Sequence, residues 1–180
     1  MVINYHNISL NSPNLSDYIN LYEQSFPADE RRETTDLTRI IEHCNDFHIT
    51  GAFDGDTFLG FFTHWRWNDH QLAYGEHFAI MPEARCGGIG RQVLEHVLAE
   101  VGLPMVIEVE PDADPLTRRR IAFYERAGFR PWPDVAYVQP PYSSGRSSLP
   151  LMLMSHGPMT EDTLKHAVRL IHQRVYGVGK

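Results

Sequence analysis

The chain has 180 residues, a length that suits one well-buried domain and is short for two. Its formal charge of −7 argues against nucleic acid as a partner, because such binders need a basic surface to neutralise phosphates. Apolar residues make up 42% of the chain, but no apolar stretch approaches the length of a membrane span, so we expect no membrane partner.

The first half of the chain predicts two helices followed by a group of strands. Residues 16–26 show the apolar spacing of a helix that Ser16 caps and Pro27 ends, and a second helical pattern runs through residues 37–41. From residue 47 the pattern changes to strands. These are residues 47–53, residues 57–65 after the hairpin signal Asp54-Gly55-Asp56, and about residues 72–80.

The second half alternates helices with strands. A glycine-rich turn at residues 85–90 opens a helix with regular apolar spacing, and Gly102 is placed as its C-terminal cap. The elements that follow are a strand at residues 105–110, a helix at 115–127, strands around 134–138 and 150–154, and a helix from about residue 160. This order predicts an α/β fold, a mixed (α+β) central sheet flanked by helices, with an extra C-terminal helix.

Cysteine and histidine usage gives no sign of a metal or disulfide framework. The two cysteines, Cys44 and Cys86, are too few for such a framework, and the N-terminus lacks the pattern of a signal peptide. We therefore expect a cytoplasmic protein. The ten histidines are dispersed, with neither His-Glu-x-x-His nor Cys-x-x-Cys spacing, so the sequence predicts no metal site.

The glycine-rich turn Arg85-Cys86-Gly87-Gly88-Ile89-Gly90 has the composition of an anion site. Glycines directly before a helix let the backbone approach a ligand, while the first N–H groups point outward to a phosphate or pyrophosphate. A Walker loop is excluded because Arg91 and Gln92 follow Gly90, and a dinucleotide fingerprint is excluded because its third glycine is replaced by Val93. A plain tight turn explains the motif alone equally well.

Residues 76–90, Glu-His-Phe-Ala-Ile-Met-Pro-Glu-Ala-Arg-Cys-Gly-Gly-Ile-Gly, resemble the signature of the GNAT acetyltransferase superfamily. In that signature, a strand ending in an apolar-x-Pro step precedes Gln/Arg-x-x-Gly-x-Gly/Ala at a helix start. The second half-signature follows one strand and one helix later, as Phe-Tyr-Glu-Arg-Ala-Gly-Phe at residues 123–129. The runs at residues 137–142 and 150–155 are similar to a bacterial subgroup of small members whose acceptor is undefined.

The resemblance covers about residues 4–154 and implies one GNAT-like N-acetyltransferase domain over residues 1–180. The core would span about residues 4–155 and a C-terminal helical extension about 158–177. Such a domain implies acetyl-CoA as co-substrate, no metal, and a small-molecule or peptide amine as acceptor. The sequence names neither the acceptor nor the length of the acyl group, and it leaves a homodimer open.

The resemblance also assigns residues to the acetyl-CoA site. The pyrophosphate would contact the main chain of Arg85, Cys86, Gly87, Gly88, Ile89 and Gly90, with Arg91 beside it, and the pantetheine arm that of Phe78, Ala79 and Ile80. The arm would enter where the strand at 72–80 splays from the strand at 105–110. Many members carry Asn and Ala where this chain has Thr117 and Arg120, so one pantetheine contact is in doubt. Residues 118–120 are either contacts to the CoA 3′-phosphate or a solvated helix face.

Acyl transfer to an amine requires a base, because an alkylamine has a pKa of about 10.4 and must lose a proton first. Glu76 is the predicted base. It shares strand parity with Phe78, so we expect it on a sheet face where burial raises its pKa, with His77 on the opposite face. Glu108 and Glu110 on the neighbouring strand are alternatives, and a structural carboxylate paired with an arginine is the other interpretation of Glu76.

Tyr124 occupies the position of the superfamily's usual general acid, which protonates the departing thiolate. Because Phe123 is adjacent, either ring could instead belong to the core. Cys86 lies where a helix dipole would lower the pKa of its thiol, so it is either a reactive group or a small side chain in a variable position.

Three loops are expected to line the acceptor pocket, at residues 27–32, 65–71 and 139–149. Four aromatic residues there form either a wall for a cation or ordinary sheet packing: Trp65, Trp67, Tyr137 and Tyr142. Besides an active N-acyltransferase, the sequence allows a non-catalytic acyl-CoA sensor on the same fold. A phosphate-binding module unrelated to CoA is the third hypothesis.

Overall fold

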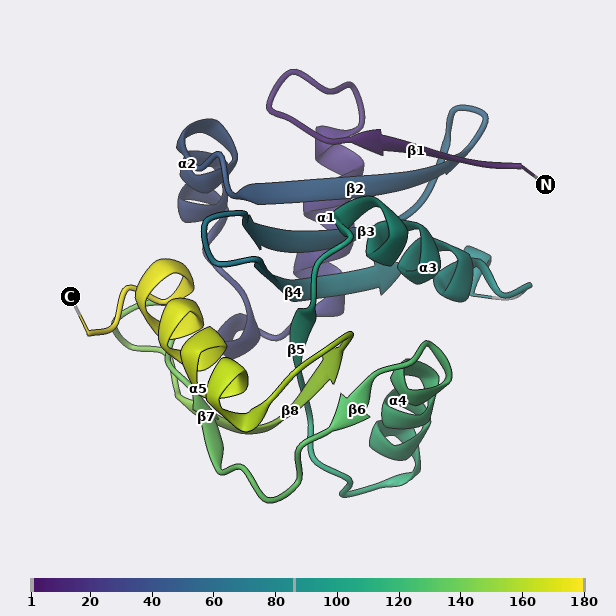
Figure 1. The fold of residues 1–180 in the computed structure, drawn as a ribbon. Coiled ribbons are helices and arrows are strands. Elements are labelled where there is room, and N and C mark those ends of the chain that lie inside the picture. The colour runs from purple at the N-terminus through teal and green to yellow at the C-terminus, as the bar shows by residue number, and fades with distance from the viewer. Residues whose placement is uncertain (1, 86, 180) are drawn as a thin grey trace.

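A computed structural model describes residues 2–85 and 87–179 of the chain. Its strands are β1 (Ile3–Asn7), β2 (Phe47–Asp54), β3 (Thr57–Trp67), β4 (Leu72–Ile80), β5 (Met105–Val109), β6 (Arg130–Pro131), β7 (Tyr137–Gln139) and β8 (Leu149–His156). They form one sheet in the order β1-β2-β3-β4-β5-β8-β6, with β7 paired to β8 beside this path (Figure 1). Because the β4–β5 pair is parallel and the β2–β3 pair antiparallel, the sheet is mixed, as predicted.

Helices cover both faces of this sheet. They are α1 (Leu15–Ser25), α2 (Thr34–His43), α3 (Ile89–Val101), α4 (Pro115–Arg126) and α5 (Glu161–Leu170), with the short turns η1 (Ala28–Glu30), η2 (Pro82–Ala84) and η3 (Ile171–Val175). One apolar core lies under α1, α2 and α5, and a second lies under α3 and α4. The sheet therefore separates two layers, as in the predicted α/β fold (Figure 1).

Two predictions at the N-terminus were wrong. The strand β1 is not among the predicted elements, and it pairs antiparallel with β2 from Ile3 opposite Asp54 to Asn7 opposite Thr50. The helix α1 begins at Leu15 with Asn14 in the cap position, so Ser16 is not its cap. The reason is a preceding turn, in which the Leu15 N–H donates to the Ser12 carbonyl and leads the chain into the helix two residues earlier.

The β3–β4 pair contains an irregularity that matters for the site. Thr63 lies opposite His77, whereas His64 lies opposite Gly75, so Glu76 is an extra residue without a cross-strand partner. Such a bulge interrupts the alternation of side chains along a strand. Residues before and after Glu76 therefore cannot be assigned to faces by simple parity.

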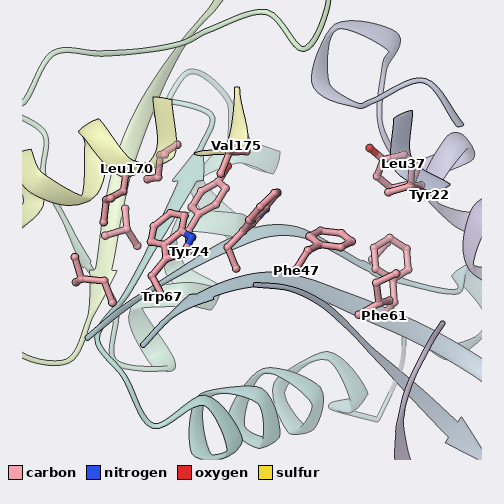
Figure 2. Close-up of a cluster of buried hydrophobic side chains, with 14 of the residues drawn as sticks. Tyr22, Leu37, Phe47, Phe61, Trp67, Tyr74, Leu170 and Val175 are labelled. Carbon is pink, nitrogen blue, oxygen red and sulfur yellow. The ribbon is translucent and has the colours of Figure 1, made fainter. Parts of the chain in front are cut away.

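The C-terminal helix is part of the larger core. Figure 2 shows Leu170 and Val175 beside Trp67 of β3 and Tyr74 of β4. The helix begins with Thr160 as its N-cap, whose hydroxyl accepts from the Thr163 N–H. Its apolar face thus covers the sheet next to the splay described below.

We predict that Leu170→Ala lowers the free energy of unfolding by about 2–5 kcal/mol, the cost of a buried leucine truncation. Leu170 is 5% exposed and packs within the larger core. Urea denaturation measures the change, and Val178→Ala, at a residue that is 45% exposed, is the control. An unchanged midpoint for Leu170→Ala would show that α5 is only an appendage.

Candidate active site

The glycine-rich turn leads into the first main-chain amides of α3. Gly88, the N-cap of α3, has φ 76°, a left-handed conformation that side chains beyond glycine adopt at a cost. The Gln92 N–H donates to the Gly88 carbonyl, so the N–H groups of Ile89, Gly90 and Arg91 lie in the first turn without intrahelical partners. This arrangement suits an anion. Cys86 lies outside the described residues.

A pocket of about 330 Å³ adjoins this turn. The turn, the end of β4 and the helix α4 line it, through Ile80, Arg85, Gly88, Gly90, Arg91, Phe123, Arg126 and Ala127. The Arg85 N–H donates to the Pro82 carbonyl, which corrects the prediction that this amide is free for a ligand. The Arg85 side chain remains at the pocket and donates from Nε to the Ile80 carbonyl at 3.1 Å.

Strands β4 and β5 separate beside this pocket. They pair at Ala73 with Met105, Tyr74 with Val106 and Gly75 with Ile107, and their pairing ends there. In residues 2–85 and 87–179, no strand pairs with the β5-facing edge of β4 at residues 76–80. Their main-chain groups on that edge are available to an extended ligand arm, so the splay predicted for the pantetheine arm is present.

Two carboxylates flank the mouth of the splay. Glu76 and Glu108 are the residues that directly follow the last β4–β5 pair, one on each strand. The Tyr176 hydroxyl contacts Glu108 and is 3.5 Å from the Tyr142 hydroxyl, which donates to Glu76. These contacts place both acids on the face covered by α1 and α5, opposite the pocket.

The predicted parity of Glu76 was wrong, and the bulge is the reason. Phe78 packs on Phe123 on the pocket side of the sheet, with ring centres 6.0 Å apart. His77 shares the face of Glu76 instead of opposing it, because its ring lies 6.0 Å from that of Tyr142. The His77 Nε2 atom is 2.8 Å from the Glu30 carbonyl oxygen, so the imidazole holds the loop between α1 and α2.

Glu76 is a fully covered, ion-paired carboxylate. Its side chain is 0% exposed; it pairs with Arg32 and accepts from Trp65 Nε1 at 2.7 Å and the Tyr142 hydroxyl at 2.9 Å. Burial alone would raise the pKa of Glu76, but Arg32, His77 and the Trp65 donor together hold the pKa below its ordinary value. The prediction of a raised pKa was therefore wrong.

Glu108 has the opposite electrostatic character. The Tyr176 hydroxyl donates to its Oε2 atom at 2.8 Å, and the Tyr137 hydroxyl donates to Oε1. Burial raises the pKa of Glu108 to about 7, even though these hydrogen bonds lower it. Glu110, in contrast, pairs with Arg120 at the surface. A pKa of about 7 lies in the range of a base at neutral pH, whereas the pKa of Glu76 is lowered away from that range.

Comparison with known proteins identifies the family. The Acetyltransferase (GNAT) family matches residues 15–129, more than half of the chain. The chain belongs to the GNAT family. A comparison with curated protein sequences gives no match.

Solved structures extend the likeness to the C-terminus. A Bacteroides thetaiotaomicron protein assigned to the GNAT acetyltransferases is 35% identical with a TM-score of 0.91, and the match covers 98% of this chain and 99% of that one. An Elizabethkingia anophelis GNAT acetyltransferase with acetyl-CoA bound is 16% identical, with TM-score 0.59 and coverage of 87% and 98%. An aminoglycoside 6′-N-acetyltransferase complexed with coenzyme A is 17% identical, with TM-score 0.64 and coverage of 89% and 100%. At these low identities the last two show the GNAT fold alone.

The second GNAT half-signature places Tyr124 on the pocket side of the sheet. Its ring packs against Phe123 and Phe129 at centre distances of 5.2 and 5.5 Å, and Phe123 lines the pocket. Burial raises the pKa of Tyr124 to about 12, while Arg120 lowers it. The hydroxyl is therefore protonated at neutral pH and makes no hydrogen bond within the described part of the chain.

Three other residues that the sequence singled out in this GNAT protein, Arg118, Thr117 and Trp67, contact other parts of the protein. Arg118 pairs with Asp112 at 3.4 Å, so at least that arginine belongs to a solvated helix face. Thr117 closes a capping box with Asp114 at the start of α4. Trp67 is fully buried in the core and does not line an acceptor wall.

Two of the four aromatic residues, Trp65 and Tyr142, already contact a cation, the side chain of Arg32. The Arg32 guanidinium carbon lies 4.7 Å from the centre of the Tyr142 ring and 5.7 Å from that of Trp65. Arg32 Nη2 also donates to the Val175 carbonyl at 3.1 Å. The sequence places Arg32 in a loop and gives no signal for Tyr176, because the contacts of these two residues leave no local pattern.

A second cavity, of about 200 Å³, lies away from the splay between the first three strands and α3. Four histidines line it: His6, His48, His64 and His96. In residues 2–85 and 87–179, no three histidine, cysteine or acidic side chains are placed to hold a metal ion. Within the same residues, no helix is both long and apolar enough to cross a membrane.

We predict that Arg32→Met lowers the free energy of unfolding at pH 7 by about 3–5 kcal/mol, because it leaves a buried carboxylate without its partner. The pKa of Glu76 in the folded protein lies below its ordinary value. The pair therefore stabilises the protein above the unfolded-state pKa, and this contribution is lost as the pH falls through the folded-state pKa. The deficit of the variant should shrink on acidification.

Urea denaturation at pH 7 and at lower pH measures this effect. Adding Glu76→Gln to Arg32→Met should restore part of the lost stability, since the buried charge is then gone. Arg118→Met, which breaks the exposed pair with Asp112, is the matched control and should change stability far less. Equal effects of the two arginine variants would refute the buried pair.

Proposed function

We propose that the protein is an acetyl-CoA-dependent N-acetyltransferase that passes an acetyl group directly to a primary amine of a small molecule or peptide. The observation that carries this proposal is the pair of carboxylates, Glu76 and Glu108, at the mouth of the splay and opposite the glycine-lined pocket. A donor in the pocket would reach through the splay toward these acids. Membership of the GNAT family, and the relatives solved with acetyl-CoA or CoA, support the choice of donor.

The described residues fit this donor. The first-turn amides of Ile89, Gly90 and Arg91 would bind its diphosphate, helped by the charges of Arg85 and Arg126 at the pocket. The open edge of β4 at Phe78, Ala79 and Ile80 would bind the pantetheine arm through main-chain hydrogen bonds. When bound, acetyl-CoA supplies the thioester carbonyl that the amine attacks.

Glu108 suits the role of the base better than Glu76, which is the residue that the sequence predicted. A base must hold a proton that it takes from the amine, so a pKa of about 7 suits the role at neutral pH. Glu76 is committed to Arg32, and protonating it would leave that guanidinium without its buried counter-ion. We assign Glu76 the task of fixing the Arg32 loop beside the acceptor.

Tyr124 acts on the leaving sulfur. Its hydroxyl keeps its proton at neutral pH, because its pKa is about 12. A thiol has a pKa of roughly 8.5, so complete proton transfer from the tyrosine to the thiolate is uphill. Tyr124 therefore stabilises the departing thiolate as a hydrogen-bond donor, and a proton from solvent completes the step.

Release of free thiol from acetyl-CoA across a panel of polyamines, aminoglycosides, amino acids and peptides tests this function. With an accepted amine, Glu108→Gln should lower kcat by about 10²–10⁴-fold, the usual value of a general base, and leave the Kd for acetyl-CoA unchanged. Tyr124→Phe should also lower kcat with little change in that Kd. Glu110→Gln, at the residue that directly follows β5, is the matched control and should retain activity.

Equal activity of Glu108→Gln and wild type would exclude Glu108 as the base. Tight binding of acetyl-CoA without turnover of any amine would favour the alternative function, a non-catalytic acyl-CoA sensor on the same fold. The cytoplasmic location and a homodimer stay predictions.

A further inference from the structure

The C-terminal segment reaches the acceptor face of the splay, although it lies outside the family match at residues 15–129. It supplies two polar contacts there: the Val175 carbonyl accepts from Arg32, and the Tyr176 hydroxyl donates to Glu108. Both residues follow α5, at or just after the π-helical turn η3. The site described above is thus incomplete without the last part of the chain.

Local geometry and packing fix the position of Tyr176. Its N–H donates to the Ile171 carbonyl, five residues earlier, at 3.3 Å, which closes the wide π turn. Ile171 and Val175 are buried in the larger core, and Figure 2 shows Val175 beside Tyr74. The wide turn is rare and is often found at functional sites.

Tyr176 lies among hydroxyl groups that all converge on the two carboxylates. Its hydroxyl is 3.3 Å from that of Tyr74 and 3.5 Å from that of Tyr142. The titratable and charged groups around Glu108 are Tyr74 and Glu76 from β4, Tyr137 from β7, Tyr142 from the β7–β8 loop, Tyr176, and Arg32 behind Glu76. Burial raises the pKa of each of the four tyrosines, so they stay protonated as donors at neutral pH.

We propose that Tyr176 is a positioning residue of the acceptor site, whose hydroxyl, together with that of Tyr137, holds the Glu108 carboxylate at the mouth of the splay. This inference rests on the proposed function, in which Glu108 accepts the proton of the amine as the C–N bond forms and the C–S bond breaks. Two donors on one carboxylate fix its orientation and favour its charged form. Once Glu108 is protonated, Tyr176 can turn its hydrogen bond to Tyr142 or Tyr74.

The test is the titration of Glu108 by ¹³C NMR of glutamate-labelled protein, with the resonance assigned by its loss in Glu108→Gln. In the wild type the carboxyl should titrate near neutral pH. Tyr176→Phe keeps the ring but removes one hydrogen bond to a charged group, so the midpoint should move upward by about one pH unit. Tyr137→Phe should move it in the same direction.

Tyr5→Phe is the matched control, because Tyr5 stacks on His96 away from the splay and should leave the midpoint of Glu108 unchanged. An unchanged midpoint in Tyr176→Phe, with thermal stability retained, would overturn the proposal, as would a wild-type midpoint near the ordinary glutamate value. This readout needs no acceptor. A failed search for an accepted amine would therefore count against the proposed function and not against the position of Tyr176.

Discussion

The site depends on one constraint, the early end of hydrogen bonding between β4 and β5. Three residue pairs join these strands, and the last is Gly75 with Ile107. A Cβ atom at Gly75 would lie 2.7 Å from the Phe62 ring and 3.0 Å from an Ile107 methyl group, so a larger residue would force these side chains to shift. Beyond it the strands part, so donor groups of β4 become available and two acids face one another across the opening.

The sheet then acts as a partition with different chemistry on each side. The pocket side offers amides, arginines and a protonated tyrosine, which suit a phosphorylated donor and a departing thiolate. The other side offers carboxylates and tyrosine hydroxyls, which suit an amine that must lose a proton. A buried ion pair, Arg32 with Glu76, ties β4 to the loop before α2 and to the C-terminal segment.

Much of this architecture could be predicted from the sequence, because its signals are local. The glycine-rich turn, the helix α3 that it opens and the strand β4 that ends before Pro82 are short-range patterns. The orientation of Glu76 could not be predicted from parity, since the bulge appears only when β3 is laid beside β4. Gly75, a glycine within a strand, was the one available signal. The partners of Glu108 come from β7 and from the last turn of the chain, so the balance between its burial and its hydrogen bonds exists only in the folded protein.

The most direct test of this account is amide hydrogen exchange with and without acetyl-CoA, followed by mass spectrometry of peptides that contain β4 and the glycine-rich turn. The account predicts slower exchange in two places on binding: the open edge of β4 at residues 76–80 and the first turn of α3 at residues 89–91. Protection of the first turn of α3 alone would contradict it, because the protein would then bind a phosphate without admitting the acyl arm between its strands.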